Sequence, residues 1–224
     1  MRPAYSVPVP CLCLVTDRKL CSDESLEERV AAAVSGGVDM VQLREKDLPA
    51  EELLKLALRL RTITQGKALL VINDSLDVAL AVEADGLHLP QESPLVRQAR
   101  QMAPPDFLIG KSVHDHSSAS VAYQEGADYL ILGTIFPTAS KPGVAPGGIP
   151  RVFKVASTVA APVLAIGGVN SHNIASVIGA GAYGVAVSSA ILGATDAKGA
   201  AQELKEALVA VWKVWRATVG EGML

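Results

Sequence analysis

Three side chains that could hold an anionic ligand stand at every second position in the stretch MVQLREK. Gln42, Arg44 and Lys46 end an apolar run that begins at Val38. In a β-strand, residues i, i+2 and i+4 share a face, so these three would project together. Cations in such a place call for an anionic partner, because a buried unpaired charge is costly. The alternative is that the strand ends near Leu43 and that solvated charges follow it.

Polar residues also follow several later apolar runs, where they could contribute to the same site. They are Asn73, Asp74, Ser112, His114, Thr138, Ser140 and Lys141. Asp74 suits a Mg²⁺ ligand, since Mg²⁺ prefers carboxylates together with phosphate oxygens. Within N-D-S it could equally be a turn residue. His88 and His114 are candidates for acid–base chemistry, although lone histidines are more often hydrogen-bonded structural residues.

Two glycines and two serines in the last third of the chain indicate a phosphate site. Gly167 and Gly168 would let backbone N–H groups approach an anion without an intervening Cβ. Ser188 and Ser189 add hydroxyl groups at the start of a short apolar segment. The alternative interpretation of the two glycines is a tight turn.

A single phosphate at these loops would leave three cations unexplained. Arg44, Lys46 and Lys141 would supply a second cluster of positive charge, with arginine giving bidentate contacts and lysine a point charge. A diphosphate or a second anionic substrate would account for them.

The elements that must position these residues form a regular alternation of short apolar runs and amphipathic helical segments. The runs are expected to be strands at Leu12–Thr16, Met40–Leu43, Leu69–Ile72, Gly86–Leu89, Phe107–Gly110, Tyr129–Gly133, Val163–Ile166 and Gly184–Val187. Between them, a stripe such as Leu53, Leu56, Leu60 and Ile63 has helical spacing. Ser22 or Asp23 could cap the first helix.

Eight such units predict an α/β protein that is a single (β/α)8 TIM barrel, with its active site at the carboxyl ends of the strands. The domain would cover residues 1–224, with an N-terminal extension over residues 1–11 and a C-terminal helix over about residues 196–224. A doubly wound sheet is the alternative, but no G-x-G-x-x-G follows the first expected strand.

Composition narrows the range of partners. A net charge of −3 argues against general nucleic-acid affinity, and no apolar run has the length of a membrane span. Cys11, Cys13 and Cys21 are expected to be free thiols in a reducing cytoplasm. A stripe from Leu208 to Trp215 in the last helix is expected to pack on the barrel, although it could serve a homo-oligomer. The expected partners are therefore small molecules, with no nucleic acid or membrane.

The order of the motifs resembles one known family. VQLREK, INDS, ADGLHLPQES, IGKSVHD, GTIFPTASK, AIGGVN and AVSSAI fall within about residues 12–195. Their order and content resemble the thiamine phosphate synthase family, whose superfamily also includes a thiazole tautomerase. The resemblance implies that a hydroxymethylpyrimidine diphosphate is joined to a thiazole phosphate, giving thiamine phosphate and pyrophosphate. Pyrophosphate would leave first, and the thiazole nitrogen would capture the pyrimidine cation.

The resemblance also assigns roles to residues. The implied catalytic residues, which would help the diphosphate to leave, are Arg44, Lys46, Ser112 and Lys141. The implied substrate contacts are Gln42, Arg44, Lys46 and Asn73 for the pyrimidine diphosphate, Ser112 and Lys141 for pyrophosphate, Thr138 and Ser140 for the thiazole, and Gly168, Ser188 and Ser189 for its phosphate. Mg²⁺ is the implied cofactor, with Asp74 as a ligand.

One departure from the family pattern leaves alternatives open. Ser93 stands where a second Mg²⁺ carboxylate is expected, and the adjacent Glu92 would point in another direction. A metal-independent thiazole tautomerase is one alternative, although that branch carries a histidine where this chain has Thr134. His114 or His88 would then have to replace it. A non-catalytic phosphate-ligand-binding paralogue is another alternative.

Overall fold

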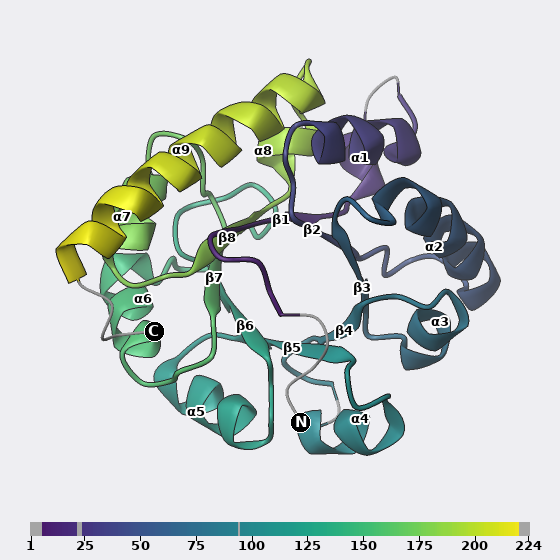
Figure 1. Ribbon diagram of the computed structural model, residues 1–224, viewed down its shortest axis with the longest axis horizontal. Helices are drawn as coiled ribbons and strands as arrows, with labels where there is room; N and C mark the ends of the chain where they lie inside the picture. The colour runs from purple at the N-terminus through teal and green to yellow at the C-terminus, as the bar shows by residue number, and fades with distance from the viewer. Residues whose placement is uncertain (1–5, 22–23, 94, 220–224) are drawn as a thin grey trace.

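Eight parallel strands close into a barrel in the order of the sequence (Figure 1). The computed structural model describes residues 6–21, 24–93 and 95–219. The strands are β1 Cys11–Val15, β2 Met40–Leu43, β3 Leu69–Asn73, β4 Gly86–Leu89, β5 Leu108–Val113, β6 Tyr129–Gly133, β7 Val163–Ile166 and β8 Gly184–Val187. β1 pairs with both β2 and β8, which completes the ring. The predicted TIM barrel is confirmed.

Helices surround this ring. They are a 3-10 turn η1 Arg18–Leu20, and α1 Leu26–Ser35, α2 Ala50–Thr64, α3 Leu76–Ala81, α4 Val96–Met102, α5 His116–Gln124, α6 Gly148–Ala156, α7 Ile174–Gly179, α8 Ser189–Leu192 and α9 Ala197–Val219. The stripe predicted for α2 faces inward, with Leu53, Leu56 and Leu60 buried. Amphipathic spacing therefore located this helix correctly, as expected for a helix with one buried face.

The start of α1 differs from the sequence-based expectation. Ser25 caps the helix by accepting a hydrogen bond from Glu28 N, and the Glu28 side chain accepts one from Ser25 N. This reciprocal arrangement is a capping box. Ser22 and Asp23, the predicted caps, lie outside the described residues.

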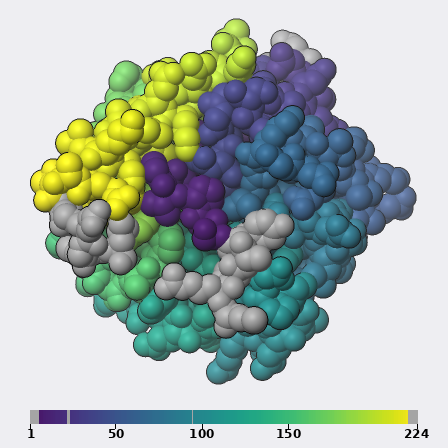
Figure 2. Space-filling view, in the orientation of Figure 1, coloured from purple at the N-terminus to yellow at the C-terminus, as the bar shows by residue number. Residues whose placement is uncertain are grey.

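The barrel is packed on both sides of its wall. Side chains that point inward form one apolar cluster, which includes Cys11, Cys13, Met40 and Tyr129. Val7 belongs to the same cluster, so the segment before β1 covers the barrel at the amino ends of its strands. Figure 2 shows that segment, in purple, crossing the middle of the face. A larger cluster packs the outward side of the strands against the helices.

Three aspartates repeat one arrangement at the amino ends of the strands. Asp39 accepts a hydrogen bond from Leu12 N at 2.7 Å, and Asp85 accepts one from Leu70 N at 2.7 Å. Asp128 does the same for Ile109 N. Each aspartate precedes an even-numbered strand and ties it to the strand before.

A cation from a helix completes each of these arrangements. Lys205 of α9 pairs with Asp39 at 2.7 Å, and Arg61 of α2 pairs with Asp85 at 2.8 Å. Arg100 of α4 pairs with Asp128. These ion pairs therefore link α2, α4 and α9 to the amino ends of the strands, opposite the predicted active site.

The apolar stripe of the C-terminal helix α9 packs on the barrel. Leu208 and Trp212 are buried against the barrel, and Trp215 packs partly on the same cluster. Packing against the barrel, the predicted use of this stripe, is confirmed.

Cys11 and Cys13 are buried free thiols, and Cys21 is partly buried and also free. Among the described residues, no helix combines the length and apolarity needed to cross a membrane.

Candidate active site

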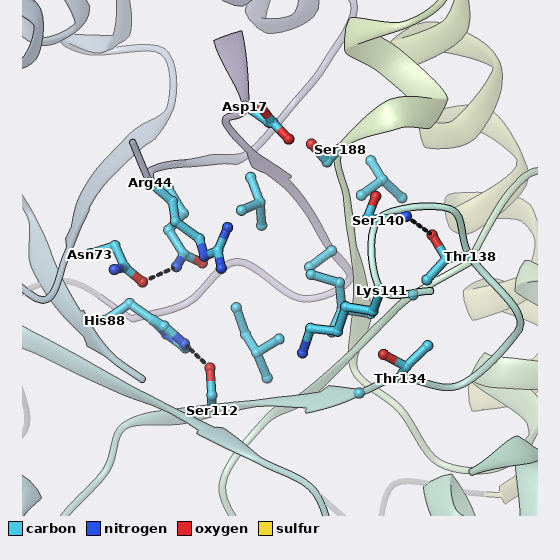
Figure 3. A pocket seen from close by; sticks show the side chains of 18 of the residues that line it. Asp17, Arg44, Asn73, His88, Ser112, Thr134, Thr138, Ser140, Lys141 and Ser188 are labelled. Carbon is cyan, nitrogen blue, oxygen red and sulfur yellow. Dashed lines mark hydrogen bonds between the residues drawn. The ribbon is translucent and has the colours of Figure 1, made fainter. Parts of the chain in front are cut away.

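A cavity of about 320 Å³ lies at the carboxyl ends of the strands. All eight strands, or the loops that follow them, contribute to its wall. Figure 3 shows polar side chains reaching into it from several directions, with Arg44 and Lys141 extending toward its middle. Carboxyl strand ends are where TIM barrels carry their active sites, so this cavity is the candidate.

Gln42 and Asn73 form a fixed pair on neighbouring strands. Gln42 Nε2 donates to Asn73 Oδ1 at 3.0 Å, and the Gln42 side chain is buried. Gln42 Oε1 is also buried and has no hydrogen-bond partner among the described residues. A buried acceptor without a donor is costly, so this oxygen is suited to accept a hydrogen bond from a bound ligand.

The cations of VQLREK stand just beyond their strand. β2 ends at Leu43, yet Arg44 and Lys46 line the cavity together with Gln42. Arg44 N donates to Thr16 Oγ1 at 2.8 Å, which fixes the backbone where it leaves the barrel. The expected strand end at Leu43 is therefore correct, but the charges that follow it face the cavity.

The intervening acidic residues point away from the cavity, toward Arg18. Arg18 Nη1 lies 3.1 Å from Glu45 and 2.7 Å from Asp47. The hydrogen bonds from Arg18 hold the pKa of Asp47 well below its usual range. Because these acids are paired elsewhere, they do not neutralise Arg44 and Lys46.

Arg44, Lys46 and Lys141 consequently share one cavity, and none of them forms a salt bridge with another described residue, although Asp17 and Glu92 also line the cavity. Burial lowers the pKa of Lys141, and the positive charges of Arg44 and Lys46 lower it further. Mutual repulsion of this kind favours binding of a multiply charged anion, which would neutralise all three.

A row of hydrogen-bonded polar groups runs from the barrel interior to the wall of the cavity. His88 Nε2 lies 2.8 Å from Ser112 Oγ, and His88 Nδ1 lies 3.2 Å from Tyr129 Oη. Burial lowers the pKa of His88 to about 3, with smaller contributions from Lys111 and Arg44. His88 is therefore neutral at pH 7 and both of its nitrogens are engaged.

His114 has a different environment at the edge of the same cavity. Its Nδ1 is hydrogen-bonded to the carbonyl oxygen of Gly133, and because a carbonyl only accepts, Nδ1 carries the proton. In the neutral ring, Nε2 is then the basic nitrogen. The imidazole thus lies beside the exit of β6, next to Thr134.

Glycines and a serine form another part of the wall. Gly167 and Gly168 have φ of +100° and +65°. A Cβ on Gly168 would lie 2.5 Å from Pro137 O, so the close approach of these loops requires glycine. Ser188 Oγ is buried and has no hydrogen-bond partner among the described residues. It is available to donate to a ligand oxygen.

The residues expected to hold Mg²⁺ lie at the margin of the site. Asp74 and Ser93 do not line the cavity, and the Ser93 hydroxyl donates to Asp74 Oδ1. Lys111 Nζ donates to the carbonyl oxygens of Pro90 and Ser93, at 2.8 and 3.2 Å. No cluster of three His, Cys, Asp or Glu side chains suited to a metal occurs within the described ranges.

This donor set fits only one kind of Mg²⁺ site. Mg²⁺ is often bound by one or two carboxylates, with water and substrate phosphate oxygens completing its shell. Asp74 supplies one carboxylate, while Ser93 supplies a neutral oxygen. The residues therefore fit an ion held largely by a bound diphosphate, rather than one held by the protein alone.

All eleven predicted catalytic and substrate-binding residues line the one cavity. They are Gln42, Arg44, Lys46, Asn73, Ser112, Thr138, Ser140, Lys141, Gly168, Ser188 and Ser189. Their individual roles stay predictions. Sequence reasoning missed Asp17 and Thr16 at the exit of β1, although LVTD has the same apolar-to-polar pattern as the other strand ends. It also missed Tyr129, which is hidden within an apolar run.

Fold and cavity together define a (β/α)8 barrel with a cation-rich cavity at the carboxyl ends of its strands, where enzymes of this fold carry their active sites. Residues 12–191 match the family model described as thiamine monophosphate synthase. The chain belongs to this family.

Individual relatives agree with that assignment. The chain is 42% identical over 201 residues to the thiamine-phosphate synthase of Methanoculleus marisnigri, covering 89% of this chain and 95% of the relative. It is 43% identical over 197 residues to that of Moorella thermoacetica, covering 87% and 94%. A solved thiamine phosphate pyrophosphorylase from Pyrococcus furiosus superimposes with a TM-score of 0.82 at 37% identity, covering 90% and 96%. A 3-hexulose-6-phosphate synthase at 19% identity shares the fold, with a TM-score of 0.67.

Proposed function

We propose that this protein is a thiamine phosphate synthase. It would condense hydroxymethylpyrimidine diphosphate with a thiazole phosphate or its carboxylate, giving thiamine phosphate and pyrophosphate. The observation that carries the proposal is one cavity that holds three cations without a salt bridge, together with a Ser188 hydroxyl that has no hydrogen-bond partner among the described residues. Such a cavity can accept two anionic substrates at once.

The first step would break the bond between the pyrimidine methylene carbon and the diphosphate oxygen. The electron pair leaves with pyrophosphate, and Arg44, Lys46 and Lys141 stabilise the charge that develops there. Gln42 Oε1 would accept a hydrogen bond from the pyrimidine amino group, with Asn73 holding the amide in place. Binding in this way orients the methylene carbon before the bond breaks.

The second step would form a carbon–nitrogen bond. The thiazole nitrogen donates its lone pair to the pyrimidine cation, so no protein base has to remove a proton. Gly168, Ser188 and Ser189 would hold the thiazole phosphate, while Thr138 and Ser140 contact its ring. The protein contributes chiefly by holding the two reactants in the attacking geometry.

Mg²⁺ is part of the proposal. When bound, it would neutralise part of the diphosphate charge, an effect of several kcal/mol in sites of this kind. Asp74 would hold it, assisted by the Ser93 oxygen.

A cytoplasmic location is likewise proposed. The free thiols and the small-molecule site are consistent with it.

Replacement of Arg44 tests the function. With both substrates and Mg²⁺, we expect the wild type to form thiamine phosphate, and we expect Arg44→Gln to lower kcat/KM by about 100-fold. The matched control is Arg97→Gln, on the exposed face of α4, which should retain wild-type rates. A wild type without product, or an Arg44→Gln variant as active as the control, contradicts the proposal.

The position of His114 favours a second candidate, a thiazole tautomerase. Its Nε2 is the basic nitrogen of a ring that lines the cavity, whereas both nitrogens of His88 are engaged. Offered the thiazole carboxylate phosphate alone, a tautomerase would interconvert the two isomers and His114→Gln would stop it. A synthase would leave that substrate unchanged until the pyrimidine diphosphate is added.

A further inference from the structure

The buried row Tyr129, His88 and Ser112 links the barrel interior to the cavity. These residues come from adjacent strands β6, β4 and β5 and are joined by two hydrogen bonds, of 3.2 and 2.8 Å. His88 and Tyr129 are at most 1% exposed, while Ser112 lines the cavity together with His88. The row therefore ends at the wall of the site.

The direction of these hydrogen bonds follows from the charge state of His88. Burial keeps the ring neutral, so one nitrogen donates and the other accepts. Tyr129 Oη has no hydrogen-bond partner other than His88 Nδ1 in the part of the chain that the structure describes. If Nδ1 carried the proton, the buried Tyr129 hydroxyl would have no acceptor, at a cost of about 1–3 kcal/mol.

The row therefore has one favoured arrangement. Tyr129 donates to Nδ1, the proton of the ring lies on Nε2, and Nε2–H donates to Ser112 Oγ. Ser112 then has its own O–H proton left for the cavity. In the opposite tautomer, Ser112 would donate to His88 and could offer the cavity only an acceptor.

Packing fixes the tyrosine in place. A Cβ on Gly110 of β5 would lie 2.1 Å from Tyr129 Cζ, so the phenol ring rests directly on that strand. Because the ring is fully buried, it has no room to turn away. The tyrosine hydroxyl is thus held against His88 by the barrel itself.

We infer that Tyr129 and His88 are positioning residues that make Ser112 a hydrogen-bond donor to the leaving diphosphate. This inference rests on the proposed function for the identity of the anion. A donor aimed at a leaving oxygen contributes most when negative charge develops there, so its effect falls on kcat rather than on KM.

The hydrogen-bond directions can be measured without turnover. Nitrogen-15 NMR of the imidazole should show His88 as the Nε2–H tautomer at pH 7, and Tyr129→Phe should shift the ring toward Nδ1–H. Tyr123→Phe, the same change on the exposed face of α5, should leave the spectrum unchanged. An Nδ1–H tautomer in the wild type overturns the inference.

Kinetics then test the role of the row. We expect Ser112→Ala to lower kcat by about 100-fold, and Tyr129→Phe to lower it by about 10-fold with KM unchanged. Because Tyr129 is inferred to act through Ser112, adding Tyr129→Phe to Ser112→Ala should cause no further loss. Full additivity, or a Tyr129→Phe variant with wild-type kcat, contradicts the inference.

Failure of the proposed function would have a different signature. The wild type would then form no thiamine phosphate, while the tautomer of His88 would still be read from the NMR spectrum. Inorganic pyrophosphate would replace the substrate as probe, and Tyr129→Phe should weaken its binding about as much as Ser112→Ala does. Unchanged pyrophosphate affinity in both variants would overturn the inference in that case.

Discussion

At the scale of single residues, Ser93 is where this chain departs most from its family pattern. Its hydroxyl is bonded to Asp74, so one carboxylate and one neutral oxygen stand where two carboxylates are expected. We predict that Ser93→Asp tightens Mg²⁺ binding in the presence of pyrophosphate by about tenfold, which equals about 1.4 kcal/mol.

Calorimetric titration with Mg²⁺ measures this change directly. Ser117→Asp, on the exposed surface of α5, adds the same charge away from the cavity and serves as the control. An affinity that rises equally in both variants would show that net charge, rather than a new ligand, is responsible.

Lys141 should destabilise the protein in the absence of a ligand. Its pKa is lowered by burial and by Arg44 and Lys46, so the protonated form is disfavoured in the folded state. At pH 7 we predict that Lys141→Met raises the melting temperature of the free protein and removes most of the increase that pyrophosphate causes in the wild type.

The same substitution on α6, Lys154→Met, is the matched control because Lys154 is exposed outside the cavity. Differential scanning fluorimetry with and without pyrophosphate gives both quantities. A Lys141→Met protein that pyrophosphate still stabilises as strongly as the wild type would place the anion elsewhere.

At the scale of elements, the aspartates at the amino ends of the strands separate stability from function. Asp85 is 6% exposed, binds Leu70 N and pairs with Arg61. Asp85→Ala would leave a buried N–H and a cation without their partner. We predict a loss of about 2–4 kcal/mol in the free energy of unfolding, with kcat unchanged per folded molecule.

Urea unfolding measures the loss, and Asp106→Ala, an exposed carboxylate nearby, should cost little. A large drop in kcat for Asp85→Ala would mean that the two ends of the barrel are coupled.

Most elements could be predicted from the sequence, for a physical reason. Strands of a parallel barrel are buried on both faces, so they read as continuous apolar runs, and five of the eight have the predicted bounds. β5 extends to Val113, three residues beyond the expected Gly110, because Lys111 and Ser112 are polar strand residues that serve the site. A search for apolar runs therefore predicts too early an end for a strand whose last residues are polar because they contribute to the site.

The residues that follow the strands and line the cavity could be predicted from the sequence, but the buried Tyr129 inside the barrel could not. Cavity-lining residues such as Arg44 and Ser112 follow apolar runs, and a parallel barrel brings all such exits together. The sequence does not mark Tyr129 as part of the site, because a tyrosine within an apolar run is typical of a hydrophobic core. Its role depends on a contact with His88, 41 positions away, that only the closed barrel creates.

At the scale of the whole molecule, the buried neutral His88 links stability to pH. Its pKa of about 3 in the folded state lies below the usual 6.5, so folding favours the neutral ring. The stabilisation is fully present above pH 6.5 and is lost as the pH falls toward 3. We predict that the melting temperature falls between pH 6.5 and 5, and that His88→Gln makes this decline shallower.

His172→Gln is the control, because His172 is exposed in the loop after β7 and should leave the pH dependence as it is. Thermal melts at half-unit pH intervals provide the comparison. Equal slopes for wild type and His88→Gln would show that His88 is charged in the folded protein.

The most direct test of the account is to quantify thiamine phosphate and pyrophosphate in one reaction containing the purified protein, both substrates and Mg²⁺. A cavity that holds both anions and lets pyrophosphate leave predicts the two products in a 1:1 ratio, with a large loss of rate when Mg²⁺ is chelated. Absence of both products at every Mg²⁺ concentration, with the protein shown to be folded, would contradict the central claim that this cavity joins the two substrates.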